Sequence, residues 1–583
     1  MNMNCHNQMV IAIFLVSILA SCAAAPASER YLTADFLTGT DAHEQPVRMR
    51  EFSKLPGSQT ADAEFTGVLK LLGPDQHGAS RTIHDPFDIV GRFSPSIGHL
   101  PAFDFEFVQR EADLVPVQRG VIRTKHPYWE YILQPGHVWK EPADGSWTRA
   151  ALPFSLQERV ANCTHNGMLT WLFDGEGNVS RVAYQVSSET CGYLKLDLWG
   201  AIPAVFEAGD VAGADAAIRR LDKHRAARLP VKPIATLAED YPGVDPTNIG
   251  TVNGVKPEDM TVYGMLVDGV HYRSSCATRH GPYPYCDSLP LPSYSTAKSI
   301  FAGLALMRME KRHPGIADQT VSSLVPECSA ERWGDVSLVD ALDMATGSYR
   351  DNGYEVDEDS APHVEFLEEE SHAKRVDFAC NHFPRRVDPG TVWVYHTSDT
   401  YLLGTALTNY VSKRHDPTVD FYRHVIVEPM WHKLNLSPLL DDTKRTYDDR
   451  SQAFAGYGLT YETDDIVRIA HWLNTRNGEL NGEPTFDERL FSGALQRNAD
   501  DRGLVPVYPS LRYNNSVWAF NAAESVGCDE DLWIPFMSGY GGITVAMLPN
   551  DTIYYYFSDG YVHRWASAVV ESDKIRSLCR SHD

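Results

Sequence analysis

The chain has 583 residues, of which 43% are hydrophobic and 11% aromatic, a composition typical of a globular protein rather than a disordered one. This length is enough for two or more domains and a large buried core. The formal net charge of −25 argues against nucleic acid or an anionic membrane surface as the main partner.

The first residues predict an exported protein. Residues 9–20 (MVIAIFLVSILA) are apolar, too few to span a bilayer comfortably, and followed by small residues, as in a signal peptide. The segment LASC at 19–22 resembles a bacterial lipobox, in which Cys22 would carry a lipid that anchors the chain to a membrane. Ordinary cleavage near Ala25 or Ala27 is the alternative. We predict a signal peptide over residues 1–27 and a location in the periplasm or cell envelope.

Cysteine usage agrees with export. Apart from Cys5 and Cys22 the number of cysteines is even, which in an exported chain predicts disulfide bonds. The candidates are Cys163, Cys191, Cys276, Cys286, Cys328, Cys380, Cys528 and Cys579. Sequential pairing is the simplest arrangement, although spacing leaves the connectivity open. No C-x-x-C motif occurs, so a redox or zinc role has little support, and we expect no metal or other cofactor.

The next part of the chain is rich in strand signals. Residues 28–208 contain alternating aromatic and β-branched stretches punctuated by turn residues, such as WEYILQPGHVWK and GNVSRVAYQVSSETCGYLKLDLW, which predict strands and hairpins. Residues 210–228 read as a helix, and a Pro-rich connector follows. We therefore predict a β-rich N-terminal domain over residues 28–228, with no assigned role, and a linker over 229–246.

Residues 247–583 show a different pattern. MTVYGMLVDGVHYR predicts two strands around an Asp-Gly turn, and GGITVAMLPNDTIYYYFSDG near the end predicts a hairpin before a final helix over 567–580. Between them lie helical stretches at 295–312, 336–344, 401–412 and 463–474. Strands at both ends with helices between predict an α/β fold in which the two ends share a sheet and a helical subdomain is inserted.

The stretch SYSTAKSIF places Ser295 three residues before Lys298, at the start of an apolar helix. Residues three apart share a helix face, and the unpaired N–H groups of a first turn can stabilise an oxyanion. A buried lysine can lose its proton readily enough to activate a serine. On this motif alone, however, a serine N-cap and a solvated lysine are the better interpretation.

Two later stretches change that interpretation. WVYHTSDTYLLGTAL contains Tyr395 before another apolar helix, and SGYGGITVAMLP places a Gly-rich entry on a strand. With these three elements in order, the chain resembles the β-lactamase-related serine hydrolases, which include class C β-lactamases, D-Ala-D-Ala carboxypeptidases and esterases. VSLVDALDMATGSY, with its Thr346-Gly347 turn, and AFAGYGLTYETDDIVRIAHWLN extend the resemblance over residues 245 to 580.

The resemblance implies a β-lactamase/transpeptidase-like antiparallel sheet flanked by helices, and roles for particular residues. Ser295 would be the nucleophile, Lys298 its activating partner, and Tyr395 the proton shuttle. Thr397 stands where the family usually has Asn; a reading of Ser398-Asp399-Thr400 as the second motif is the alternative. Tyr540, Gly541 and Gly542 fit the third motif without its usual cation, and the backbone N–H of Ile543 would complete an oxyanion hole.

These residues predict an exported serine hydrolase that cleaves a small-molecule or peptide-like ester or amide through a Ser295 acyl-enzyme. The missing third-motif cation and Thr397 favour an esterase or amidase over a D-amino-acid peptidase or β-lactamase, whose substrates carry a carboxylate. The alternative is a catalytically silent β-lactamase-like module that binds or senses a ligand.

Overall fold

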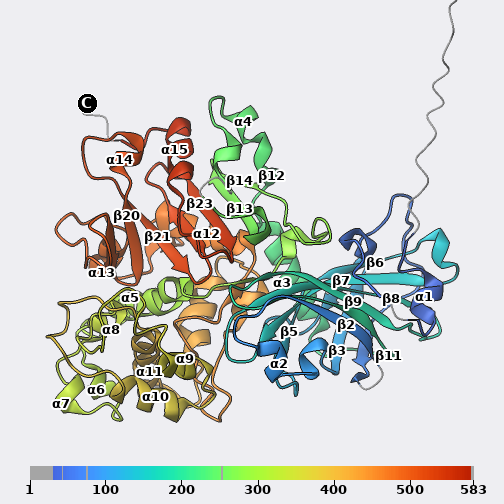
Figure 1. Cartoon of the computed structure of the whole chain (residues 1–583), viewed down its shortest axis with the longest axis horizontal. Helices are drawn as coiled ribbons and strands as arrows, with labels where there is room; N and C mark the ends of the chain where they lie inside the picture. The colour runs from blue at the N-terminus through green and yellow to red at the C-terminus, as the bar shows by residue number, and fades with distance from the viewer. Residues whose placement is uncertain (1–29, 42–43, 74–75, 251–253, 580–583) are drawn as a thin grey trace, which may run out of the picture.

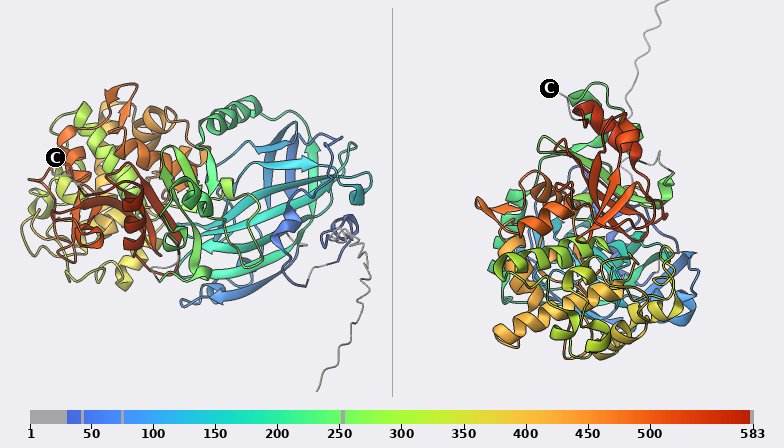
Figure 2. Two further views of the ribbon diagram at one scale, coloured as in Figure 1. Left: turned by 90° about the horizontal axis from the view of Figure 1, so that it is seen from above. Right: turned by 90° about the vertical axis from the view of Figure 1, so that its left-hand side faces the viewer.

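The computed structural model describes residues 30–41, 44–73, 76–250 and 254–579. The predicted signal peptide, Cys22 and the alternative cleavage sites lie outside the described residues. The chain forms two large β-sheets that lie side by side, with most of the helices around the second one (Figure 1; Figure 2). We call them the N-terminal sheet (strands within 67–208) and the C-terminal sheet (strands within 231–273 and 511–558).

The N-terminal sheet is antiparallel and has eleven strands in the order β11-β1-β3-β4-β6-β7-β8-β9-β10-β2, with β5 paired to β7. They are β1 (Gly67–Leu71), β2 (His77–His84), β3 (Phe103–Arg110), β4 (Asp113–Pro116), β5 (Trp129–Leu133), β6 (Gly136–Trp139), β7 (Thr148–Glu158), β8 (Thr164–Phe173), β9 (Val182–Thr190), β10 (Lys195–Ile202) and β11 (Ala204–Ala208). One stretch differs from expectation: β5 and β6 do not form a hairpin with each other, because both pair with the long strand β7.

The central strands β7, β8 and β9 are buried along their whole length. Leu169 and Trp171 point into a core inside this sheet, whereas Met168 and Leu172 join the core that contains the helices of the C-terminal part. Alternate residues of a strand face opposite ways, and the second face of these strands also holds buried polar side chains such as Ser155 and Gln157. The helix α3 (Ala214–Ala227) covers part of β3 and β4.

The C-terminal sheet has eight strands in the order β12-β14-β13-β23-β22-β21-β20-β19, all antiparallel except the β12–β14 pair. They are β12 (Val231–Pro233), β13 (Met260–Val267), β14 (Val270–Arg273), β19 (Leu511–Asn514), β20 (Val517–Asn521), β21 (Trp533–Gly539), β22 (Ile543–Met547) and β23 (Ile553–Ser558). The β13–β23 pairing joins the two ends of this part of the chain, as the sequence predicts. Strand β12 lies inside the predicted linker.

Helices cover both faces of the C-terminal sheet. Tyr554 and Tyr556 of β23 pack in a core with α15 (Ala566–Ile575), while Tyr555 and Phe557 pack in the core that holds α12 (Thr463–Asn474). The helical insertion lies between β14 and β19. It contains α5 (Leu304–Arg312), α6 (Val321–Leu324), α7 (Ala330–Trp333), α8 (Leu338–Leu342), α9 (Ala361–Glu368), α10 (His372–Asn381), α11 (Thr397–Arg414), α12 and α13 (Glu488–Ala494). The expected fold class, an antiparallel sheet flanked by helices with a helical insertion after a β-rich region, is confirmed.

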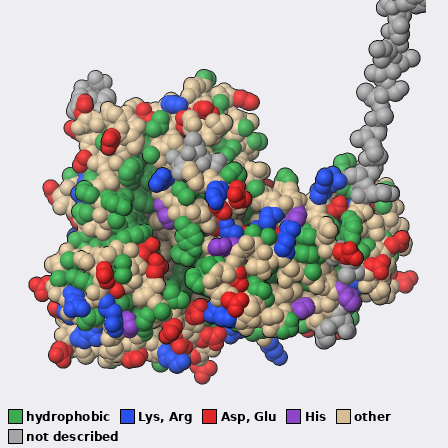
Figure 3. Space-filling view, viewed as in Figure 1, with side chains coloured by type: hydrophobic (Ala, Val, Ile, Leu, Met, Phe, Trp, Pro, Cys, Tyr) green, Lys and Arg blue, Asp and Glu red, His purple; other side chains and the backbone are tan. Residues whose placement is uncertain are grey.

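Four disulfide bonds follow the sequential order of the cysteines. They are Cys163–Cys191, Cys276–Cys286, Cys328–Cys380 and Cys528–Cys579. Such a set suits an oxidising compartment. Among the described residues, no helix has both the length and the apolar character needed to cross a membrane. In the space-filling view, hydrophobic side chains gather in a hollow between the two parts of the molecule (Figure 3).

Candidate active site

Ser295 lies in a sharp turn between a short strand and a helix. Strand β15 (Leu291–Pro292) pairs with β16 (Thr460–Tyr461), and Tyr294 then adopts a left-handed conformation with φ of 40°. Hydrogen bonds from Thr296 N to Ser293 O and from Ala297 N to Tyr294 O close the turn. Ser295 keeps partial solvent exposure while its neighbours are buried, so its hydroxyl is presented to the outside.

The helix after Ser295 differs from the regular helix that the sequence predicts from residue 295. It begins with a π-helical turn, Lys298–Gly303, and only then continues as α5. Close packing against residues 515–516 accompanies this turn: Ser299 Oγ donates to Ser516 O at 2.6 Å, and a Cβ on Gly303 would lie 2.3 Å from Ser516 Oγ. Single π-helical turns of this kind are frequent at functional sites.

Lys298 is buried, and its ammonium nitrogen lies among oxygen atoms that carry no formal charge. Its Nζ donates to Ser295 Oγ at 3.0 Å, to Thr397 Oγ1 at 2.8 Å and to the backbone O of Gly456 at 3.4 Å. Burial lowers the pKa of Lys298 to about 8, although the charges of Glu358 and Glu355 act in the opposite direction. A substantial fraction of this lysine is therefore neutral near physiological pH and able to accept the Ser295 proton.

Tyr395 lies just before α11 and is 8% exposed. The Lys298 Nζ is 4.8 Å from the centroid of its ring. Burial raises the pKa of the Tyr395 phenol well above its ordinary value, the charge of Glu358 adds to this effect, and a hydrogen bond with Ser295 opposes it. The phenol is therefore protonated and has a proton available to donate.

Glu358 is a site residue that the sequence motifs do not reveal. Its carboxylate accepts hydrogen bonds from Thr397 N at 2.8 Å and from Thr397 Oγ1, the same hydroxyl that contacts Lys298. Burial tends to raise the pKa of Glu358, but the charges of His363 and Lys298 and the two bonds from Thr397 leave it below its ordinary value. A chain of contacts thus runs from Ser295 through Lys298 and Thr397 to a carboxylate.

The acidic stretch around Glu358 is its only sequence signal. Glu355 and Asp359 accompany it within one loop before α9. Burial raises the pKa of Glu355 to about 7, and the charges of Asp359 and Glu358 contribute to the rise. The surroundings of Lys298 are therefore acidic.

The alternative second motif, Ser398-Asp399-Thr400, forms the first turn of α11 and does not contact Lys298 in any described bond. Asp399 instead accepts from Thr346 Oγ1 at 3.2 Å, which ties the predicted Thr346-Gly347 turn to α11.

His396 is buried against Asp357, with Nε2 3.1 Å from Oδ2. Burial opposes its charge, but the hydrogen bond with Asp357 and the nearby Asp399 carboxylate raise the pKa of His396 to about 9. His396 is thus a neighbour of the site with a structural partner.

The predicted third motif forms the turn between β21 and β22, so its glycines lead into strand β22. Gly541 and Gly542 pack against residues 558–562, and Ile543 is fully buried opposite Gly539. Tyr540 reaches the site through its ring, whose centroid is 5.6 Å from that of Tyr294. The residue next to the nucleophile turn is Gly539, where a Cβ would lie 3.0 Å from Ser293 O.

Two groups of described residues combine metal-ligand side chains within a small space. In the first, Cys163 and Cys191 surround His165 but form a disulfide, which removes their thiolates. In the second, His224 lies beside Asp464 and Asp465. Asp465 already accepts from Ser437 N and Oγ, at 2.7 and 2.6 Å. Burial lowers the pKa of His224 to about 3; the charge of Arg228 contributes to this lowering and that of Asp465 opposes it. The side chains of this second group already interact with hydrogen-bond donors and arginines, so we interpret the group as structural.

Several solved structures are similar to part of this chain in fold. A class C β-lactamase aligns at 14% identity over 64% of this chain and 99% of its own, with a TM-score of 0.38. A family VIII carboxylesterase aligns at 15% identity over 62% and 97%, with a TM-score of 0.39. A penicillin-binding protein homolog from Caulobacter crescentus aligns at 14% identity over 61% and 96%, with a TM-score of 0.40. Neither a protein-family model nor a curated protein matches the sequence.

Proposed function

We propose that this protein is an exported serine hydrolase of the β-lactamase-related type, in which Ser295 forms an acyl-enzyme with an ester or amide substrate. The observation that carries the proposal is the position of Lys298: buried, with a pKa lowered to about 8, and 3.0 Å from Ser295 Oγ. A purely structural lysine does not need a lowered pKa or a contact with a partly exposed hydroxyl, whereas a general base needs both.

The reaction follows from these groups. Ser295 Oγ bonds to the substrate carbonyl carbon while neutral Lys298 takes its proton, and the carbonyl π electrons move to oxygen. In the turn that carries Ser295, the internal hydrogen bonds are donated by Thr296 N and Ala297 N, not by Ser295 N. The N–H of Ser295 and a backbone N–H from the β21–β22 turn are therefore the proposed oxyanion donors. The tetrahedral intermediate then collapses, and the leaving group departs with a proton donated by Tyr395 and replenished from Lys298. Water attacks the acyl-enzyme by the same steps and releases the acid.

Charge around the site supports an esterase or amidase in preference to a β-lactamase or D-amino-acid peptidase. Glu355 and Glu358 act on Lys298, and Glu355 and Asp359 act on Tyr540, while the third motif supplies no lysine or arginine. A substrate carboxylate would meet repulsion here. Partly exposed aromatic rings at Tyr540 and Tyr561, whose hydroxyls are 2.7 Å apart, offer an apolar contact instead.

Treatment with a fluorophosphonate, read by intact mass, tests the proposal. We expect one adduct on the wild-type chain and none on Ser295→Ala, together with hydrolysis of short p-nitrophenyl esters that exceeds hydrolysis of a chromogenic cephalosporin. A folded wild-type chain that forms no adduct and cleaves neither substrate would identify it as a silent binding module.

A further inference from the structure

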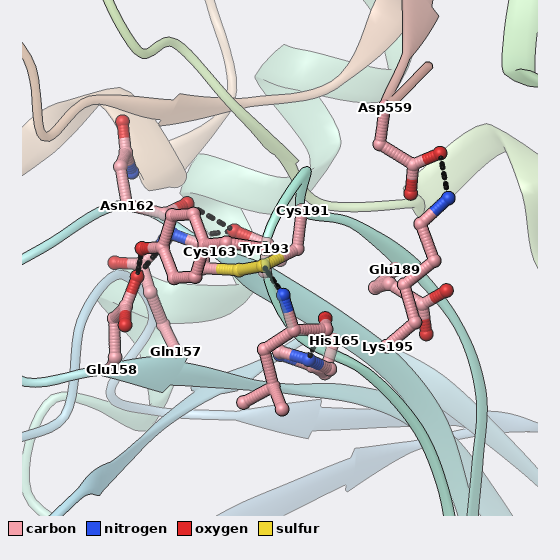
Figure 4. The surroundings of a disulfide bond; sticks show 12 residues. Gln157, Glu158, Asn162, Cys163, His165, Glu189, Cys191, Tyr193, Lys195 and Asp559 are labelled. Carbon is pink, nitrogen blue, oxygen red and sulfur yellow. Dashed lines mark hydrogen bonds and ion pairs between the residues drawn. A yellow bond between two sulfur atoms is a disulfide. The ribbon is translucent and has the colours of Figure 1, made fainter. Parts of the chain in front are cut away.

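A buried asparagine of the N-terminal part contacts the turn that carries Ser295. Asn162 lies between β7 and β8, next to the Cys163–Cys191 disulfide (Figure 4), and it is fully buried. Its side chain nevertheless makes its hydrogen bonds to the C-terminal part. Oδ1 accepts from Tyr294 N at 2.9 Å, from Gly458 N at 3.0 Å and from Ser293 Oγ at 3.1 Å, and Nδ2 donates to Leu459 O at 3.2 Å.

These bonds join two segments that form the catalytic site. One contains Ser293 and Tyr294, directly before the nucleophile, and the other follows Gly456, whose carbonyl contacts Lys298. The two segments also bond each other, with Ser293 N donating to Leu459 O at 2.9 Å and Leu459 N donating to Ser293 Oγ at 3.0 Å. The amide of Asn162 is therefore at the junction of the segments that position Ser295 and Lys298.

The backbone at this junction needs external support. Tyr294 has a φ of 40°, a strained conformation that a non-glycine residue keeps only where its surroundings hold it. Its N–H has Asn162 Oδ1 as acceptor. Without that acceptor, a buried donor loses its partner and the turn is free to relax.

The loop that carries Asn162 is itself anchored. Glu158 accepts from Cys163 N at 3.2 Å, from Tyr128 Oη at 2.7 Å and from Tyr193 Oη. The disulfide connects this loop to Cys191, and the next residues reach the other side of the site: the ring of Tyr193 is 6.2 Å from that of Tyr540. Lys195 then binds Asp559 at 2.7 Å (Figure 4).

We propose that Asn162 is a positioning residue for the reaction, so that the N-terminal sheet completes the active site rather than serving as a separate module. The inference rests on the proposed function, because it assigns Asn162 an effect through Ser295 and Lys298. Asn162 touches neither the substrate nor the reacting atoms.

The test measures acylation of the full chain by a p-nitrophenyl ester and by a fluorophosphonate. For Asn162→Ala we expect kcat to fall by roughly 10²-fold, the loss typical of an ångström-scale displacement, with little change in KM. Asn162→Asp keeps an oxygen that accepts the three bonds, but it places a buried carboxylate oxygen against Leu459 O, so it should recover only part of the rate. Ser293→Ala removes the same junction from the other side and should slow acylation in the same direction, which provides a second variant if Asn162→Ala does not fold.

Gln157→Ala is the matched control. Gln157 is also buried at the end of β7, and its Nε2 donates across to Thr460 Oγ1 at 3.2 Å, but it has no bond to Ser293 or Tyr294. We expect it to lower the melting temperature as Asn162→Ala does while leaving kcat within about threefold of wild type. Equal kcat losses in the two variants, or an unchanged kcat in Asn162→Ala, would overturn the positioning role. A wild-type chain without a Ser295 adduct would instead refute the proposed function, and this inference with it.

Discussion

Two buried lysines in different regions of the molecule have different partners, and the difference bears on the role proposed for one of them. Lys298 contacts hydroxyl and carbonyl oxygens in the helical part. Lys444 crosses between the two parts and binds the Glu130 carboxylate at 2.6 Å, with the backbone oxygens of Glu158 and Arg159 as further acceptors. Burial lowers the pKa of both lysines, but a directly paired carboxylate favours the charged form of Lys444.

Burial alone does not make a lysine a base, because a paired carboxylate favours its charged form. Lys444 and Glu130 neutralise each other beside a cavity of about 200 Å³, and Tyr447 Oη donates to Glu130 at 2.5 Å. Lys298 has no direct hydrogen bond to a carboxylate; the hydroxyl of Thr397 lies between it and Glu358. The intervening hydroxyl leaves Lys298 free to lose its proton.

Replacing each lysine by methionine should separate the two roles, and it has the largest expected effect. For Lys298→Met we expect acylation to fall by roughly 10³-fold, because the base is lost, with little loss of stability. For Lys444→Met we expect the free energy of unfolding to fall by about 3–5 kcal/mol, because Glu130 is left buried and unpaired, while the folded fraction still forms the Ser295 adduct.

Urea unfolding and the rate of fluorophosphonate labelling measure both quantities. Lys444→Met, Glu130→Leu is the control that removes both charges, and it should regain much of the stability that the single variant loses. A large stability loss in Lys298→Met with unchanged labelling would reverse the two assignments.

Two disulfides extend the comparison to the two sheets. Cys163–Cys191 closes a separation of 28 residues beside Asn162, and Cys528–Cys579 closes one of 51 residues at the far end of the C-terminal sheet. Loop-closure entropy predicts about 3–4 kcal/mol of stabilisation for each. We expect alanine replacement of either pair to lower the melting temperature similarly, but only loss of Cys163–Cys191 to slow labelling, by roughly tenfold. Equal labelling rates at a temperature where both variants are folded would contradict this.

Much of the fold could be predicted because its signals are local. The helix at 463–474 has the expected ends, since Glu462 and Asp465 form a capping box at its start. The β9–β10 hairpin and the Asp268-Gly269 turn follow from alternation and turn residues. The pairing of β5 with β7 could not be predicted, because it depends on which strand is long enough to receive two partners.

The site divides in the same way. The order of motifs draws attention to Ser295, Lys298 and Tyr395, whose side chains lie together in the structure, and their catalytic roles stay predictions. Glu358 and Asn162 escaped notice because each reaches its partner only through the fold, 39 residues from Thr397 and 132 from Tyr294. The π-helical turn likewise packs against a segment distant in the sequence, at Ser516.

The pH dependence of acylation tests the smallest of these effects, that of the Glu358 carboxylate on the pKa of Lys298. Because neutral Lys298 is the base and its pKa is about 8, we expect kcat/KM for an uncharged ester to rise tenfold per pH unit below pH 8 and to level above it. The charge of Glu358 raises the pKa of Lys298, so Glu358→Gln should move this limb to lower pH, by up to about one unit. Glu355→Gln is the matched control, and its shift should be in the same direction but smaller, because Glu358 exerts the larger effect. If the pH limb stays in place in both variants, a group other than Lys298 titrates. The contact through Thr397 would then not couple the charge of Glu358 to the pKa of Lys298.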